Sequence, residues 1–389
     1  MVATLVRVLG MRRVELAEDA VQDALCRALD VWKYRGVPEN PSAWLFQAAR
    51  NRAVDLLRRG ALADRAARRL SEQLPATVGE GEIRDDQLRM MFACAQPALP
   101  SEAQVAVMLK YLCGFGVGEI AQAFLTSAAA VEKRLARAKR AVKRERLVDL
   151  PDARAMAKRL GAVQQALYLL FSEGYHGSHP ERAIREDLCA EALRLAVLLS
   201  EHPATATPST FALLALLCLH AARLPSRIDD AGSLVLLEAQ DRTRWSRPLI
   251  EQGILFLGRS AEGPEITPFH LEAAIAAHHA RAASFAETDW PAILDLYSKL
   301  FELQPSPVVA LNRAIALGRV RGPDEGLREL DRIRGGRRLK NYPFLEAAAG
   351  DLHQRAGRIR EARVHFGRAV ALARSDSERK VLESRLAGL

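Results

Sequence analysis

Apolar residues recur along most of this chain at intervals of three and four, which is the spacing of one face of an α-helix. Between Val14 and Trp32 the pattern forms one stripe, which consists of Leu16, Ala20, Val21, Ala24, Leu25, Ala28 and Leu29. The alternation that marks strands is nearly absent. The sequence therefore predicts an all-α protein.

The first helical stripe is followed by a break rich in glycine and proline, and then by a second helical pattern at residues 43–59. Ser42 stands directly before this pattern, so we expect it to cap the helix. Residues 61–84 are polar and charged and contain Pro75. We expect them to form a linker with little fixed structure.

The stretch "EIAQAFLTSAAAVEKRLARAKR" at residues 119–140 predicts two short helices around a tight turn. Ser127 is a suitable N-cap for the second helix. The residues at inward spacing are Ile120, Ala121, Phe124, Val131, Leu135 and Ala138. The outer side carries Lys133, Arg134, Arg137 and Arg140. Glu132 lies among them, where it either repels phosphate or orders Arg134 and Lys133. This pattern is typical of a DNA-binding helix-turn-helix, although an αα-hairpin with a solvated face has the same periodicity.

Residues 153–389 also have helical periodicity, and the last part of this segment contains repeats. The spacing typical of a tetratricopeptide repeat is found among Gly350, His353, Gly357, Ala362, Phe366 and Ala369. Related offsets occur at Ile293, Tyr297, Leu300 and Pro305, and at Gly326, Leu330 and Ile333. We expect tetratricopeptide-like repeats over about 275–376, with a surface suited to a protein or peptide partner.

Composition narrows the function. The formal net charge of +9 and the pI of about 9.6 fit a polyanionic partner. The 5 cysteines are scattered, with no pair at metal-ligand spacing, so we expect buried thiols in a reducing compartment. Phosphate loops, nucleophile elbows and paired catalytic carboxylates are not found. We expect no enzyme activity, no metal and no cofactor.

Membrane insertion is not expected either. The N-terminus lacks the pattern of a cleavable signal, and the apolar run from Phe211 reads as too short to span a bilayer. The sequence predicts a cytoplasmic protein with no membrane partner.

Several of these segments resemble a known family in the expected order. "AEDAVQDAL" and "NPSAWLFQAARNRAVDLLRR" resemble region 2 of bacterial sigma factors of the extracytoplasmic-function type. "LPSEAQVAVMLKYLCGFGVGEIAQAFLTSAAAVEKRLARAKR" resembles their region 4. "DLCAEALRLAVLL", "LVLLEAQDRTRW" and "SPVVALNRAIALG" are similar to the subgroup with a long, repeat-bearing C-terminal extension.

The resemblance implies a domain order. Region 2 would occupy residues 1–60, region 4 residues 85–147, and the helical extension residues 153–389, with the linker at 61–84. The family has a further helix before Leu5, so region 2 is expected to be N-terminally incomplete. The family's helix-turn-helix usually has glycine where Leu125 stands, so a left-handed residue there would be strained.

The resemblance also implies site residues and partners. The clamp of the β′ subunit of core RNA polymerase would bind Glu18, Asp19, Gln22 and Asp23, and the β flap would bind region 4. The single-stranded −10 element would contact Asn40, Ser42, Arg50, Asn51, Arg52, Arg58 and Arg59. The duplex −35 element would contact Ser127, Ala129, Ala130, Lys133, Arg134 and Arg137. Trp44 is a tempting stacking platform, but its spacing favours a core position.

The implied function is that of a sigma factor, which directs core RNA polymerase to promoter DNA, with an extension that supports or regulates it. Two rival interpretations stay open. A helix-turn-helix regulator with a repeat-type sensor domain would bind promoter DNA without polymerase. A scaffold of helical repeats would bind neither.

Overall fold

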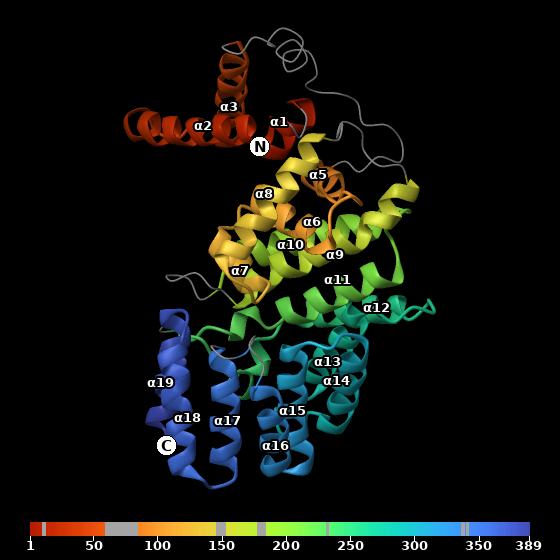
Figure 1. Cartoon of the computed structure of the whole chain (residues 1–389), viewed down its shortest axis with the longest axis vertical. Coiled ribbons are helices and arrows are strands. Elements are labelled where there is room, and N and C mark those ends of the chain that lie inside the picture. Colours follow the sequence, from red (N-terminus) through yellow and green to blue (C-terminus); the bar gives the residue numbers. More distant parts are fainter. Residues whose placement is uncertain are drawn as a thin grey trace. The chain divides into compact units, whose positions relative to one another are not determined.

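The computed structural model describes residues 1–9, 13–58, 85–144, 153–176, 184–230, 233–335, 339 and 342–389. Throughout these residues the chain is helical (Figure 1), and they contain no strand beyond one isolated antiparallel bridge from Ile228 to Leu234. The all-α prediction is confirmed. The chain divides into two compact units, Met1–Ala166 and Leu167–Leu389, and the division falls within one helix. The predicted linker at 61–84 lies outside the described residues.

Unit 1 contains two groups of helices and the first part of the long helix that continues into unit 2. Its helices are α1 (Val2–Leu9), α2 (Val14–Arg35), α3 (Pro41–Arg58), α5 (Asp86–Cys94), α6 (Ser101–Tyr111), α7 (Val117–Ala123), α8 (Ala128–Arg144) and α9 (Ala153–His176). Helix α2 packs along α3, and α1 contacts both α2 and α5. Helix α8 packs against α6 and α7. Arg159 on α9 donates a hydrogen bond of 3.1 Å to the carbonyl of Phe92 on α5.

The buried face of α2 differs from the predicted stripe. Small residues fill it, namely Ala17, Ala20, Val21, Ala24 and Ala28. Leu25 and Leu29, by contrast, are 44% and 76% exposed. The prediction that they belong to the core is therefore wrong. Alanines at these spacings let α2 approach α3 closely, and the two leucines are left beside this buried face.

The N-cap of α3 is also displaced from its predicted position. The Asn40 side chain accepts a hydrogen bond of 3.0 Å from the backbone N–H of Ala43, whereas Ser42 lies inside the first turn. Pro41 takes the first helical position, where its missing N–H costs nothing. Asn40, and not Ser42, is therefore the cap.

Unit 2 continues from the second part of α9. Its helices are α10 (Glu186–Glu201), α11 (Pro208–Ala221), α12 (Arg247–Ser260), α13 (Pro268–Arg281), α14 (Trp290–Leu303), α15 (Pro307–Arg321), α16 (Pro323–Arg334), α17 (Pro343–Arg355), α18 (Ile359–Leu372) and α19 (Asp376–Ala387). Three short 3-10 helices connect α11 to α12, at Leu224–Ser226 (η2), Leu237–Ala239 (η3) and Arg242–Arg244 (η4).

Helix α11 is the central helix of unit 2. It is apolar on every side, and it packs against α10, α12 and α13. By length and composition the window Pro208–Ser226 could cross a membrane, so the expectation that this run is too short was too strict. In the structure, however, 72% of that window is buried inside the protein. A helix that is apolar all round is also what the centre of a helical core requires.

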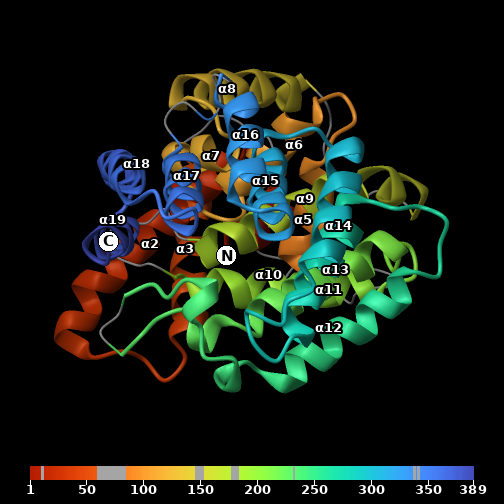
Figure 2. The same ribbon diagram turned by 90° about the horizontal axis from the view of Figure 1, so that it is seen from below.

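Helices α13 to α19 follow one another side by side (Figures 1 and 2). The residues that the repeat pattern singled out lie at their contacts. Phe366 of α18 is 2% exposed, and a Cβ placed on Gly350 of α17 would come within 2.9 Å of its ring. A Cβ on Gly326 of α16 would likewise come within 2.9 Å of the Cα of Gly318 on α15. Glycine at these positions lets neighbouring helices pack closely.

Candidate nucleic-acid interface

Helices α7 and α8 form the predicted pair around a tight turn. Glu119 accepts a hydrogen bond of 2.5 Å from the backbone N–H of Gly116 and so caps the start of α7. The Ser127 hydroxyl accepts one of 3.2 Å from the N–H of Ala130, which confirms Ser127 as the N-cap of α8. Leu125, between them, has a φ of 48° and is the one non-glycine residue with positive φ among the described residues. The expected left-handed strain at Leu125 is thus present.

The inward faces of α7 and α8 are as the periodicity predicts. Ile120 and Val131 are fully buried, while Leu135 is 8% and Ala138 1% exposed. These side chains fix the two helices to each other and to α6. The N-terminal end and the opposite side of α8 are consequently presented outward.

The residues predicted to read duplex DNA are mostly on this outward side. Ser127, Ala129, Lys133 and Arg137 are exposed, and Ala130 is half-buried. The small side chains at the start of α8 leave its backbone accessible, and the long basic ones follow one and two turns later. This arrangement can place a helix N-terminus in a major groove with basic groups near the phosphates.

Arg134 departs from this arrangement. Its guanidinium donates a hydrogen bond of 2.5 Å to the carboxylate of Glu102 on α6, and it lies 5.2 Å from the ring centroid of Phe124. Arg134 therefore points back toward its own domain and not outward with Lys133. The partner is Glu102, so the expectation that Glu132 orders Arg134 is wrong.

The acidic and amide residues predicted to bind polymerase lie along α2. Asp19, Gln22 and Asp23 are exposed, while Glu18 is partly buried. Burial raises the pKa of Glu18, an effect that the nearby cation of Lys110 opposes. Asp23 is paired with Arg52 of α3 at 2.5 Å, so one predicted polymerase contact binds one predicted DNA contact.

The same helix carries an apolar surface that the sequence had placed in the core. Leu25 and Leu29 follow Glu18 and Gln22 at intervals of three and four residues, so the four side chains share one face of α2. Tyr34 and Val37, just beyond, are 81% and 66% exposed. A mixed acidic and apolar surface of this kind is typical of a protein-binding site.

The residues predicted to bind single-stranded DNA lie in the loop before α3 and along that helix. Ser42 and Asn51 are exposed, Arg50 and Arg52 are half-buried, and the exposed Asn40 uses its side-chain oxygen as the helix cap. Arg59 and the side chain of Arg58 lie outside the described residues. Trp44 packs edge-to-face on Trp32 at 5.5 Å between ring centroids, and it is half-buried where the sequence predicted a core position.

The described residues contain no group of three or more His, Cys, Asp or Glu side chains placed to hold a metal ion. Cys94, Cys189 and Cys218 are buried, and burial raises the pKa of each thiol to about 12. Cys26 is exposed on α2 and Cys113 is half-buried, so the expectation that every cysteine is buried is wrong for these two residues.

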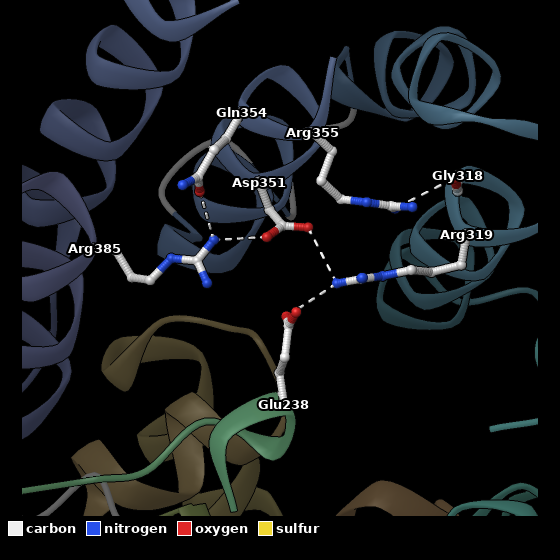
Figure 3. Close-up of polar contacts among 7 residues, drawn as sticks. All are labelled: Glu238, Gly318, Arg319, Asp351, Gln354, Arg355 and Arg385. Atoms are coloured by element: carbon white, nitrogen blue, oxygen red, sulfur yellow. Dashed lines mark hydrogen bonds and ion pairs between the residues drawn. The ribbon is translucent and has the colours of Figure 1, made fainter. Parts of the chain in front are cut away.

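A polar network ties the loop between α11 and α12 to the later helices of unit 2 (Figure 3). Arg319 of α15 pairs with Glu238 of η3 at 3.2 Å and with Asp351 of α17 at 3.5 Å. Asp351 also accepts a hydrogen bond of 2.6 Å from Arg385 of α19. Arg242 of η4 donates hydrogen bonds to carbonyls at the end of α13. The loop therefore covers part of the surface of the repeat helices, which the sequence analysis predicted to bind a protein or peptide.

Comparisons with known proteins match this layout. Residues 1–62 match the family Sigma-70 region 2, and residues 89–142 match Sigma-70, region 4. An uncharacterized protein of Rhizobium meliloti (strain 1021) is 40% identical over 387 residues, which cover 96% of this chain and 90% of that protein. The chain is an extracytoplasmic-function-like sigma-70 factor with a C-terminal extension. Residues 159–261 of this sigma factor match a family of unknown function (DUF6596).

Membership in the family fixes the coarse function. Regions 2 and 4 support a role as a sigma factor in transcription initiation, a role that is not enzymatic. They also imply binding to core RNA polymerase and to promoter DNA. The sequence reasoning missed the exposed Leu25 and Leu29 and the anchoring of Arg134. Periodicity could not reveal that Leu25 and Leu29 are exposed, because an apolar residue at helical spacing gives the same pattern whether it faces the protein's own core or a partner.

Proposed function

We propose that this sigma factor docks on core RNA polymerase through α2, reads the −10 element with α3 and the residues that flank it, and reads the −35 element with α8. The observation that carries the proposal is the pairing of an outward, basic helix-turn-helix with an outward acidic and apolar face on α2. A regulator that binds DNA alone has no use for the second surface.

The polymerase contact is proposed for the face of α2 that carries Glu18, Gln22, Leu25 and Leu29. Leu29 is 76% exposed, so a partner that covers it removes apolar surface from water. The carboxylate and amide groups beside it suit a basic partner and supply specificity. The family resemblance points to the clamp of the β′ subunit as that partner, and to the β flap as the partner of region 4.

The DNA contacts are proposed in two sets. For the −10 element they are Asn40, Ser42, Arg50, Asn51, Arg52, Arg58 and Arg59. Asn40 retains its amide N–H groups for a base while its oxygen caps α3. For the −35 element the exposed Ser127, Ala129, Lys133 and Arg137 contact DNA directly, with Ala130 beside them. Arg134 supports the helix from behind, through Glu102.

The domains are proposed as region 2 at 1–60, a linker at 61–84, region 4 at 85–147 and a helical extension at 153–389. We propose that the extension, with tetratricopeptide-like repeats at about 275–376, supports or regulates the sigma module and binds a protein or peptide. Because its partners are polymerase and promoter DNA, the protein is proposed to act in the cytoplasm.

The test uses the purified full-length chain with core RNA polymerase. We expect the two to co-elute and to transcribe from promoters that the sigma factor selects. Binding to the same promoters without polymerase would instead favour a helix-turn-helix regulator with a repeat-type sensor domain. Failure of both polymerase binding and promoter binding would contradict the proposal.

A further inference from the structure

Unit 2 holds two arginines beside a single buried aromatic ring. The guanidinium carbon of Arg227 lies 3.9 Å from the ring centroid of Tyr175, and that of Arg223 lies 6.0 Å from it. Arg223 also lies 5.5 Å from the ring of Trp245. Tyr175 is 2% and Arg223 9% exposed. Two like charges therefore share a site from which most water is excluded.

Neither charge is neutralised by a carboxylate among the residues that the structure describes. Arg223 donates a hydrogen bond of 3.2 Å to the Gln240 amide oxygen, and Arg227 one of 3.0 Å to the Tyr175 carbonyl. Burial and the neighbouring Arg227 lower the pKa of Arg223, an effect that Tyr175 opposes. Burying a charge is costly unless an opposite charge accompanies it.

The nearby acids are engaged elsewhere. Glu173, two residues before Tyr175 on α9, acts on Arg374, which also pairs with Glu378. Glu238 pairs with Arg319, and Glu272 is hydrogen-bonded to Tyr168. The charge of Glu287 raises the pKa of Arg242, although the two side chains form no ion pair. Among the residues that the structure describes, the two arginines thus face an aromatic ring and neutral groups.

Several polar atoms at or near this cluster are buried and make no hydrogen bond to the described residues. Three belong to the ring and its neighbours, namely the Tyr175 hydroxyl, Nε of Arg227 and Nδ1 of His220, and a fourth is Nδ1 of His279, which packs on Trp290. The His220 ring centroid lies 5.1 Å from that of Tyr175. Burial and Arg223 lower the pKa of both histidines, so each is neutral and can offer an N–H. Unsatisfied buried donors are rare and normally signal a missing partner.

We propose that Arg223, Arg227 and the Tyr175 hydroxyl form a binding site for a small oxyanion, the phosphate or carboxylate group of a ligand. Guanidinium forks bind such groups with charge-assisted hydrogen bonds, and the phenol supplies a further donor. Arg227 is half-buried, so the site reaches solvent on the side of this residue. The site lies in unit 2 and does not rest on the promoter contacts proposed above.

The test is thermal unfolding of the full-length protein in inorganic phosphate, in acetate and in chloride at equal ionic strength. We expect phosphate or acetate to raise the Tm more than chloride does, because only an oxyanion can engage both guanidinium forks. A larger rise with phosphate identifies a phosphoryl ligand, and a larger rise with acetate identifies a carboxylate. Equal shifts in all three salts would overturn the proposal.

Two substitutions locate the effect. Arg227→Met should weaken binding of the effective anion about tenfold or more, since a charge-assisted hydrogen bond is lost. Arg259→Met is the matched control, because Arg259 also lies 3.9 Å from an aromatic ring, that of Phe211, but is exposed.

Tyr175→Phe keeps the packing and removes the unpartnered hydroxyl alone. It should weaken anion binding severalfold without lowering the Tm in chloride, and it decides the question if Arg227→Met fails to fold. Oxyanion shifts that are the same in the wild type and in both site variants would show that the cluster is only a packed core.

Discussion

The guanidinium of Arg134 on α8 donates a hydrogen bond of 2.5 Å to the carboxylate of Glu102 on α6. It also packs over Phe124, which follows α7. These contacts connect α8 to both neighbouring helices of region 4, so they fix the direction in which Lys133 and Arg137 project. Arg134 is therefore expected to act on DNA binding by orienting α8, whereas its two neighbours act by contact.

Substitution of the basic residues of α8 should separate these two roles. Lys133→Ala and Arg137→Ala should weaken promoter binding by the polymerase complex and reduce the slope of log K against log salt by about 0.9 per lost phosphate contact. Arg134→Ala should leave that slope unchanged and lower the stability of region 4. A salt titration of promoter binding measures the slopes.

Glu102→Gln is the control for the Arg134 prediction, because it breaks the same ion pair from the side that does not face DNA. It should reproduce the loss of stability and leave the salt slope unchanged. A slope for Arg134→Ala as low as that for Arg137→Ala would place Arg134 on the phosphates instead.

Leu125 is held at a φ of 48°, where a side chain collides with its own backbone. Leu125→Gly removes this strain together with the side chain, and Leu125→Ala removes the side chain but keeps a Cβ. We expect the glycine variant to be more stable than the alanine variant by about 1 kcal/mol, measured by urea unfolding. Equal stabilities would mean that the turn carries no strain.

Leu29 is 76% exposed on the face of α2 proposed to bind polymerase. Leu29→Ser should change stability by less than about 0.5 kcal/mol, because little of the side chain is buried. It should weaken binding to core polymerase about tenfold, as removal of a buried apolar contact does. Leu255→Ser on α12, where the leucine is 63% exposed, should do neither. Binding to labelled polymerase distinguishes the two variants.

The sequence predicted the helical fold and the inward faces of α7 and α8, because apolar periodicity reports burial directly. It failed on the sidedness of α2. Two stripes overlap there, one of alanines against α3 and one containing Leu25 and Leu29, and hydrophobicity alone ranks leucine above alanine. Which stripe faces the core depends on how closely α3 can approach, which is a property of the packed pair.

The ion pairs of two charged site residues could not be predicted for a related reason. Arg134 pairs with Glu102, 32 positions away, and Arg52 pairs with Asp23, 29 positions away. Local spacing cannot reveal such pairs, because they form only when separate helices come together. The displaced cap of α3 has a local cause instead. Pro41 occupies the first helical position, so the residue before it, Asn40, becomes the N-cap.

Gly350 and Gly367 offer a matched test of packing between α17 and α18. A Cβ on Gly350 would lie 2.9 Å from the Phe366 ring, whereas one on Gly367 would meet nothing within 4 Å. Gly350→Ala should destabilise unit 2 by about 1–3 kcal/mol through overpacking. Gly367→Ala should stabilise it by about 0.5–1 kcal/mol, because alanine favours the helix. Chemical unfolding measures both, and a stable Gly350→Ala variant would contradict the close approach of the two helices.

Glu272 on α13 should make the stability of unit 2 fall as pH rises. Burial raises the pKa of its carboxyl group from 4.5 to about 7, although the hydrogen bond from Tyr168 opposes the shift. Between these pH values the folded chain keeps a proton that the unfolded chain has released, so the contribution is complete below pH 4.5 and is lost as pH rises through 7. The loss amounts to roughly 3 kcal/mol.

Glu272→Gln keeps a neutral side chain at every pH, so its stability relative to the wild type should rise by that amount from pH 4.5 to above pH 7. The lowered pKa of His279, about 3, acts in the opposite direction below pH 6.5, but it is common to both proteins and cancels in the difference. Urea unfolding at a series of pH values, followed by tryptophan fluorescence, gives the two curves. Glu251→Gln, at an exposed position on α12, is the control. Parallel curves for the wild type and Glu272→Gln would mean that the carboxyl group is already ionised in the folded protein.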